Sequence, residues 1–377
     1  MMASKAKKLS PVFVLILAIL CFVVGAAAGF LGAARDNYLS PVDEYGEISR
    51  HGKRKNVGGE IGGDLQIHFL ELGNYYTGDC VYIKAGDTDI LIDAGSKSSS
   101  VPTIAAYLND YVTDGKLEYV IVTHAHTDHY AGFAAKEGIF DLYECGTIID
   151  FARTNQKATA STYNKYIAKR DAEVAAGATH LTALECIEKG ETDYAVADGI
   201  NMKILDSYYY SHPSPDENNY SVCMLLSEGE NNYLFTGDLE ADGEKYLVEM
   251  NDLPEVVLYK AGHHGSKTSS SDELLSVIKP EIVCVCCCAG SAEYTSTEAN
   301  KFPTQAFIDR VAPYTDQVYV TTIFESDKDK TFTSMNGNIT VCSDGSRVWV
   351  VCSASDLLLR ETAWFEEKRT CPAAWQK

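Results

Sequence analysis

Three histidines and one aspartate lie within six residues of one another. His124, His126, Asp128 and His129 follow an apolar run, 119–122, which the hydrophobic pattern predicts as a buried strand. Imidazole nitrogens are common ligands of zinc and similar divalent ions, and a carboxylate oxygen can complete such a ligand set. The spacing lets His124 and His126 converge on one ion while Asp128 and His129 turn toward a second. The alternative, a polar surface loop, explains this density of imidazoles poorly.

Further candidate ligands follow other predicted strands, where loops at the edge of a sheet often carry function. Asp238 comes after the apolar stretch 234–236 in a Gly-Asp turn, where a carboxylate can bridge two ions. His263 and His264 follow the predicted strand 255–260. We predict His264 as a ligand of the second ion and His263 as a substrate contact or acid, although the residues alone do not separate the two roles.

Four more polar side chains complete the expected site. Lys260 and Ser266 flank the histidine pair and are expected to face the substrate, where a cation stabilises developing negative charge. Asn219 and Ser221 are predicted substrate contacts, because amide and hydroxyl groups are weak zinc ligands but good partners for phosphate or water. The predicted catalytic residues are Asp128, His263, Lys260 and Ser266.

Composition limits the choice of function. The 377 residues allow one large domain or two smaller ones, and 32 basic against 53 acidic residues give a formal charge of −21. Such a charge argues against broad nonspecific nucleic-acid binding but does not exclude a local basic groove. Four of the twelve cysteines lie within 284–288 and are predicted as small buried hydrophobes. Cys342 and Cys352 flank a predicted hairpin, and the sequence leaves open whether they pair.

The N-terminal segment is predicted to be a membrane anchor. Three lysines precede an uncharged run over 9–34, which is long enough to cross a bilayer. Lysines before the run favour a single-pass protein of the cell membrane with its catalytic domain outside the cell. The alternative is a cleaved signal peptide and a secreted protein. The predicted division is 1–34 cytoplasmic lysines and anchor, 35–63 flexible linker, 64–352 catalytic domain and 353–377 C-terminal tail.

The hydrophobic pattern predicts two β-rich halves, each followed by helices. Strands are predicted at 65–70, 80–84, 89–93, 118–123, 146–150, 202–205, 221–226, 233–236, 255–260, 281–288, 317–321, 337–342 and 347–351. Helices are predicted at 101–113, 160–177, 243–250, 271–278 and 303–311, and a short amphipathic helix is predicted in the tail at 355–377. This order suggests an α/β fold of two packed sheets with helices outside.

The motifs together resemble a known family. The segment 124–129 with Asp238 is similar to the metallo-β-lactamase superfamily, which implies an αββα four-layer sandwich. The segments 78–79, 91–95, 219–222, 236–238 and 260–266 resemble the exported domain of the ComEC competence protein in a stand-alone form. Similar domains occur in cell-surface phosphorylcholine esterases.

One feature departs from the superfamily's usual pattern. The superfamily usually has another histidine ligand between the first motif and the bridging aspartate, and here Asn219 and Ser221 occupy that stretch. The first ion would then have His124, His126, Asp238 and water.

The resemblance implies a hydrolase with two divalent ions, zinc or alternatively manganese, that share Asp238 and a hydroxide nucleophile. We predict a membrane-anchored extracellular phosphodiesterase or nuclease whose substrate is DNA or a cell-wall phosphodiester. One alternative is hydrolysis of a C–O or C–N bond, as in a lactone or β-lactam, which the missing histidine disfavours. The other is a non-catalytic metal-binding surface module. The sequence predicts no protein partner.

Overall fold

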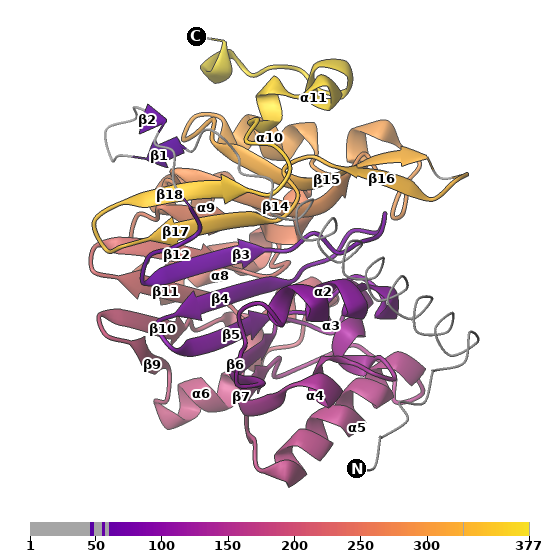
Figure 1. Ribbon diagram of the computed structural model, residues 1–377, viewed down its shortest axis with the longest axis vertical. Helices are drawn as coiled ribbons and strands as arrows, with labels where there is room; N and C mark the ends of the chain where they lie inside the picture. Colours follow the sequence, from indigo (N-terminus) through magenta and orange to yellow (C-terminus); the bar gives the residue numbers. More distant parts are fainter. Residues whose placement is uncertain (1–45, 49–54, 57–59, 327, 377) are drawn as a thin grey trace, which may run out of the picture. The chain divides into compact units, whose positions relative to one another are not determined.

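The computed structural model describes residues 46–48, 55–56, 60–326 and 328–376, all within the compact unit Val42–Lys377 (Figure 1). The predicted anchor and most of the predicted linker lie outside these residues. Within the described part of the chain, no helix is both long and apolar enough to cross a membrane.

Two β-sheets form the centre of the unit. The ten-stranded sheet has the order β2 (Lys55–Asn56), β1 (Gly46–Ile48), β18 (Val348–Cys352), β17 (Ile339–Ser343), β3 (Leu65–Phe69), β4 (Val81–Ala85), β5 (Thr88–Ile92), β6 (Lys116–Val122), β7 (Glu144–Asp150) and β8 (Thr179–Thr182). The eight-stranded sheet has the order β16 (Thr331–Ser334), β15 (Val318–Ser326), β14 (Ile282–Ala289), β13 (Leu258–Lys260), β12 (Asn231–Phe235), β11 (Met224–Glu228), β10 (Ile200–Ile204) and β9 (Asp193–Ala197). The sheets pack through buried apolar side chains, among them the stacked rings of Phe69 and Phe235.

Helices cover the outer face of each sheet (Figure 1). The ten-stranded sheet carries α2 (Val101–Leu108), α3 (Thr127–Ala134), α4 (Ile139–Leu142) and α5 (Ser161–Ala176). The eight-stranded sheet carries α8 (Ala241–Met250), α9 (Asp272–Ile278) and α10 (Gln305–Val311). Two short helices, α6 (Ala183–Lys189) and α7 (Tyr208–Ser211), lie in connections between strands. The layers confirm the predicted two-sheet α/β sandwich.

Parallel strands bring the candidate site together. Neighbours β5, β6 and β7 are parallel in one sheet, and β12, β13 and β14 are parallel in the other. The carboxyl ends of parallel neighbours meet at one edge of a sheet, and ligands commonly bind there. The loops after β5, β6, β12 and β13 carry the polar residues that the sequence singles out.

Two segments are more ordered than the sequence suggested. Within the predicted linker, β1 pairs with β18 and β2 pairs with β1, because the edge of β18 offers unpaired backbone groups. The predicted C-terminal tail is part of the folded domain. It forms α11 (Ala363–Lys368) and the short 3₁₀ turns Leu359–Glu361 and Ala373–Trp375, and it packs beside α10 (Figure 1). Burial of Trp364, Phe365 and Trp375 explains this packing.

The cysteines behave as core residues. Every cysteine of β14 is buried and free, as predicted for small hydrophobes. The disulfide left open between Cys342 and Cys352 is not formed. In the antiparallel pair β17–β18, Cys342 lies opposite Trp349 and Cys352 lies opposite Ile339, so the register separates the two thiols.

Candidate metal centre

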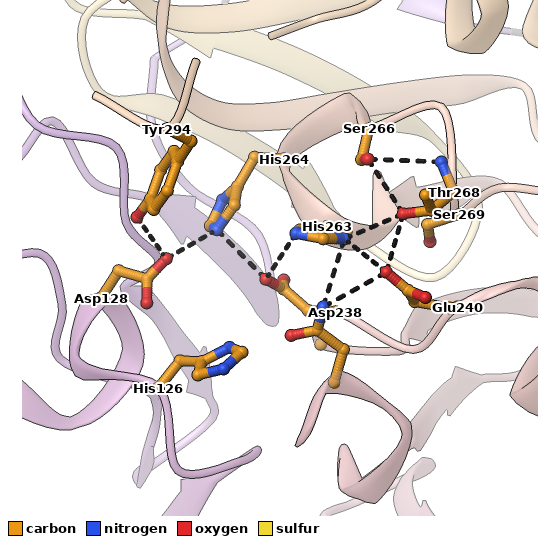
Figure 2. Close-up of polar contacts among 12 residues, drawn as sticks. His126, Asp128, Asp238, Glu240, His263, His264, Ser266, Thr268, Ser269 and Tyr294 are labelled. Atoms are coloured by element: carbon orange, nitrogen blue, oxygen red, sulfur yellow. Dashed lines mark hydrogen bonds and ion pairs between the residues drawn. The ribbon is translucent and has the colours of Figure 1, made fainter. Parts of the chain in front are cut away.

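Four buried side chains, Asp128, His129, Asp238 and His264, place their polar atoms around one point between the two sheets. Figure 2 shows Asp128, Asp238 and His264 of this cluster. Nε2 of His129 lies 3.1 Å from Asp238 Oδ2, and Nε2 of His264 lies 3.2 Å from the same oxygen. The His264 nitrogen is also 3.3 Å from Asp128 Oδ2. One ligand atom from each residue lies within 4.8 Å of the others. Two imidazoles and two carboxylates are a donor set that suits zinc or manganese.

Unsatisfied polar atoms in this cluster fit a metal site. Within the described residues, Nε2 of His129, Nε2 of His264 and Oδ1 of Asp238 are buried and have no hydrogen-bond partner. Nearly all buried polar atoms in proteins have a partner, so three exceptions around one point call for an explanation. A divalent ion held by these atoms supplies it.

The histidines and carboxylates of this cluster shift one another's pKa strongly. Burial alone would lower the pKa of His129 and His264, but neighbouring carboxylates, led by Asp238, raise the pKa of both imidazoles well above the ordinary value. Burial alone would raise the pKa of Asp238, but the imidazoles hold it well below its usual range. A divalent cation and these protons compete for the same atoms, so metal binding would release protons.

Asp93 orients His129. It follows β5, and its Oδ2 accepts a 2.7 Å hydrogen bond from Nδ1 of His129. The two carboxylate oxygens also accept bonds from the backbone N–H and the hydroxyl of Thr123. Because Nδ1 of His129 carries the hydrogen, its Nε2 is the nitrogen free to bind a metal. The sequence identified Asp93 only as part of a resembling motif.

A second buried carboxylate supports His264. Nδ1 of His264 donates to the backbone oxygen of Cys286 at 2.9 Å and lies 3.1 Å from Asp79 Oδ1. Lys260 forms an ion pair with Asp79 on the other side and lies 3.8 Å from Asp238 Oδ1. Burial alone would lower the pKa of Lys260, but these two carboxylates raise it. Only 2% of Lys260 is exposed, so the structure places its ammonium behind the ligands rather than toward a substrate.

His124 and His126 lie beside the cluster, with Nε2 of His124 3.0 Å from Nδ1 of His126. The ring of His124 packs 4.2 Å from that of His129. Ser221 is fully buried here. Its hydroxyl accepts a 3.1 Å bond from the Asp238 N–H and lies 3.4 Å from Nδ1 of His124. Ser221 therefore positions two candidate ligands.

The turn after β12 needs its glycine. Gly237 has a φ of 54°, a left-handed conformation that favours glycine. A side-chain carbon there would lie 2.9 Å from atoms of Ser221 and Thr123. The turn thus brings Asp238 close to His124–His129, as the Gly-Asp pattern suggested.

The adjacent histidines point in different directions. His263 and His264 both have left-handed backbones, with φ of 48° and 55°. This conformation sends His264 into the cluster, where it is 1% exposed, and leaves the side chain of His263 21% exposed (Figure 2). Such φ values are unfavourable for residues other than glycine and are typical of functional sites.

His263 has its own carboxylate partner. Its Nε2 lies 3.9 Å from Asp238 Oδ2, and its Nδ1 lies 3.4 Å from Glu240 Oε1 (Figure 2). Glu240 is held in place by Thr268, whose hydroxyl donates to it at 2.8 Å, and by the amide of Asn218 at 3.3 Å. This arrangement directs Nε2 of His263 toward the metal cluster.

Two predicted contact residues have structural partners. The amide of Asn219 donates to Ser214 Oγ, and its oxygen accepts from the Glu240 backbone N–H, so Asn219 supports the start of α8. Ser266 is 5% exposed, and its hydroxyl lies 3.0 Å from that of Thr268. Neither side chain lies within the ligand cluster.

Sequence reasoning assigned no role at the site to four residues that the fold brings there: Asp79 and Asp93, which it named only as parts of the resembling motifs, and Glu240 and Tyr294, which it did not name. Isolated polar residues carry no spacing pattern, so only their place after or before a strand could have suggested them. Tyr294, in the loop after β14, donates a 2.7 Å hydrogen bond to Asp128 Oδ2.

The sequence of this region is similar to that of a known protein superfamily. Residues 73–180 match the model of the metallo-beta-lactamase superfamily, and this range includes the segment 124–129. This part of the chain is therefore similar to the metallo-β-lactamase superfamily, in agreement with the two-sheet α/β sandwich and the buried cluster of histidines and aspartates.

Three curated relatives are competence or recombination proteins. Recombination protein 2 of Haemophilus influenzae is 32% identical over 125 residues, which cover 33% of this chain and 14% of that protein. ComE operon protein 3 of Bacillus subtilis is 31% identical over 102 residues, 26% of this chain and 12% of that protein. Competence protein ComA of Neisseria gonorrhoeae is 27% identical over 233 residues, which cover 61% of this chain and 28% of that protein. They confirm the ComEC-like resemblance, although the chain spans less than a third of each relative.

Solved structures of metallo-beta-lactamase proteins align with parts of this chain at low scores. The metallo-beta-lactamase fold protein YhfI from Bacillus subtilis aligns with a TM-score of 0.41 and 12% identity, over 70% of this chain and 97% of YhfI. The metallo-beta-lactamase from Hirschia baltica aligns with a TM-score of 0.25 and 15% identity, over 48% of this chain and 70% of the Hirschia protein. At these scores the alignments carry no argument about activity.

Proposed function

We propose that this chain is a metal-dependent phosphoesterase that cleaves DNA or a cell-wall phosphodiester outside the cytoplasm. The observation that carries the proposal is the buried ligand set next to the partly exposed His263, which Glu240 orients. The competence and recombination names of the relatives support DNA. The apolar run at 9–34 supports an anchored, extracellular enzyme.

The residues divide into ligands and their supports. Asp128, His129, Asp238 and His264 would hold a divalent ion, and His124 with His126 would supply ligands for a second. When bound, such ions activate water as a nucleophile and stabilise charge on a phosphoryl group. The Cys286 backbone oxygen keeps the hydrogen of His264 on Nδ1, with the charge of Asp79 beside it, and Asp93 does the same for His129. The Nε2 atoms of both histidines therefore face the ion.

His263 is the residue best placed to act on the leaving group. Its Nδ1 faces Glu240 and Thr268, which leaves Nε2 directed into the site. A proton held at Nε2 can pass to the leaving oxygen of the ester. Lys260 balances the charge of Asp79 in this proposal and does not contact the substrate.

A substrate panel tests the proposal. The purified chain with Mn²⁺ or Zn²⁺ is expected to hydrolyse bis(4-nitrophenyl) phosphate, and to cleave either DNA or a glycerol-phosphate polymer, while leaving β-lactams and lactones intact. Asp238→Asn should lower kcat on the order of 100-fold or more, because it removes a ligand charge. Asp252→Asn, at an exposed position, is the matched control.

Two results would overturn the proposal. One is turnover of a lactone or β-lactam without turnover of any phosphoester. The other is metal-loaded protein that hydrolyses no phosphoester at all, which would favour a non-catalytic surface module.

A further inference from the structure

Tyr294 connects the candidate metal ligands with solvent. Its hydroxyl donates a 2.7 Å hydrogen bond to Asp128 Oδ2, yet the residue as a whole is 52% exposed (Figure 2). A half-exposed residue whose hydroxyl reaches a buried carboxylate lies at the border of the site. Nothing in the sequence pattern marks this residue.

The residue beside Tyr294 ties its loop to the opposite sheet. Glu293 accepts a 2.9 Å hydrogen bond from the Thr77 backbone N–H, just before β4. It also forms a 2.9 Å ion pair with Lys97, which follows β5. The loop from β14 is thus attached to the ten-stranded sheet at the residue before Tyr294. These two contacts of Glu293 therefore hold the loop that carries Tyr294 against the ten-stranded sheet.

A second aromatic residue continues this surface inward. The ring of Phe302 lies 5.8 Å from that of Tyr294, 5.8 Å from His264 and 5.7 Å from His263. The ring of Phe302 therefore connects the exposed Tyr294 with the candidate ligand His264 and also contacts His263. An aromatic surface beside a hydrolytic site favours a flat, apolar group over a hydrated polyol.

We propose that Tyr294 is a specificity-determining residue whose ring, backed by Phe302, packs against a planar aromatic group carried by the phosphoester. The inference rests on the proposed function and deepens it. Stacking of a planar ring on an aromatic side chain strengthens binding substantially, whereas a glycerol or other aliphatic group gains little. Packing against Phe302 holds the tyrosine ring beside the site, and the ring itself supplies the stacking surface.

Phosphonates test the proposal without turnover, because their C–P bond is not hydrolysed. The metal-loaded full chain is titrated calorimetrically with phenylphosphonate and with propylphosphonate, which carry the same anionic group. We expect phenylphosphonate to bind on the order of tenfold more tightly. Tyr294→Phe should keep this preference, since it keeps the ring. Tyr294→Leu should bring the two affinities to within about twofold.

Two further variants separate the effect of the Tyr294 ring from that of its hydrogen bond and from that of losing any tyrosine. Tyr294→Gln removes the ring but retains a donor for Asp128, and it should lose the preference as Tyr294→Leu does. Tyr194→Leu, on the edge strand β9, should leave the preference unchanged. Equal affinities in the unmodified chain, no binding of either phosphonate, or a preference that survives Tyr294→Leu would each overturn the proposal.

The outcome also separates this inference from the proposed function. A chain that prefers phenylphosphonate but hydrolyses no phosphoester would contradict the proposed function and support the role of Tyr294. A chain that hydrolyses phosphodiesters without any aromatic preference would contradict the role of Tyr294 alone.

Discussion

Lys260 and Asp79 form a buried ion pair directly behind His264, and each side chain is about 3% exposed. A pair in this position compensates the charge of the carboxylate that faces Nδ1 of His264. Removing one partner leaves an uncompensated buried charge, which is much more costly than removing both. The pair is therefore part of the support for the metal ligand.

Lys260→Met should lower the free energy of unfolding by about 3–5 kcal/mol, because it leaves the Asp79 carboxylate buried without a cation. The double variant Lys260→Met with Asp79→Asn should recover a large part of that loss. Urea unfolding at constant metal concentration measures both. A double variant no more stable than Lys260→Met would contradict this role for the pair.

Glu240→Gln should reduce the ability of His263 to protonate a leaving group, since it removes the carboxylate beside Nδ1. We expect kcat for a phosphodiester with an alkyl leaving group to fall about 10- to 100-fold. The fall should be much smaller for 4-nitrophenolate, which leaves without protonation. Glu249→Gln, exposed on the same helix, serves as control. Equal losses for both leaving groups would exclude a proton-transfer role.

At the residue scale, the sequence was informative where ligand types cluster. His124, His126, Asp128 and His129 stand out by density alone. The supporting residues Asp79 and Glu240 do not, because a single acidic residue in a loop has no pattern. Their roles arise only when strands far apart in the chain end at the same edge.

At the scale of elements, β3 carries a buried histidine that should make stability depend on pH. His68 is fully buried between Tyr107, 2.8 Å from its Nδ1, and Thr340 at 3.1 Å. Burial lowers the pKa of His68 from about 6.5 to about 3. Between these values the unfolded chain binds a proton that the folded chain does not, so acid favours unfolding.

The free energy of unfolding should therefore fall as pH drops below about 6.5, with a contribution from His68 of about 2 kcal/mol at pH 5. His68→Gln should remove this part of the pH dependence, which urea unfolding at pH 7, 6 and 5 measures. His212→Gln, at an exposed histidine, should follow the unmodified chain. Parallel curves for the unmodified chain and His68→Gln would contradict the assignment.

Most strands were predictable because they alternate or form apolar runs, as in β3, β6 and β12. Elements without such runs were missed, among them β8 and α3. The start of α6 did have a signal, since Thr182 and Glu185 form a capping box in which each side chain binds the other's backbone N–H. Asp128 and His129 proved to lie in the first turn of α3 rather than in a loop.

At the scale of the whole molecule, the C-terminal segment is part of the hydrophobic core between the eight-stranded sheet and its helices. Trp375 is 4% exposed, and its indole N–H donates to the Thr315 backbone oxygen at 2.9 Å. The sequence predicted a tail with a short amphipathic helix here, and α11 lies within it. Its apolar side chains pack against one another and against α10 and neighbouring strands, which lie far away in the sequence.

Trp375→Ala should destabilise the fold by about 3–5 kcal/mol, because it removes a large buried ring. Leu357→Ala, at a side chain that is 45% exposed, should change stability by less than about 0.5 kcal/mol. Thermal and urea unfolding compare the two variants. A loss at Trp375 as small as that at Leu357 would show that the segment is not part of the core.

The central claim is that Asp128, His129, Asp238 and His264 bind the metal that the hydrolase requires. The most direct test is the metal content of extensively dialysed protein, measured by mass spectrometry for the unmodified chain, His264→Ala and the surface control His212→Ala. We predict that the unmodified chain and the control retain a divalent transition metal, whereas His264→Ala loses most of it. Equal retention in His264→Ala would contradict the assignment of this cluster.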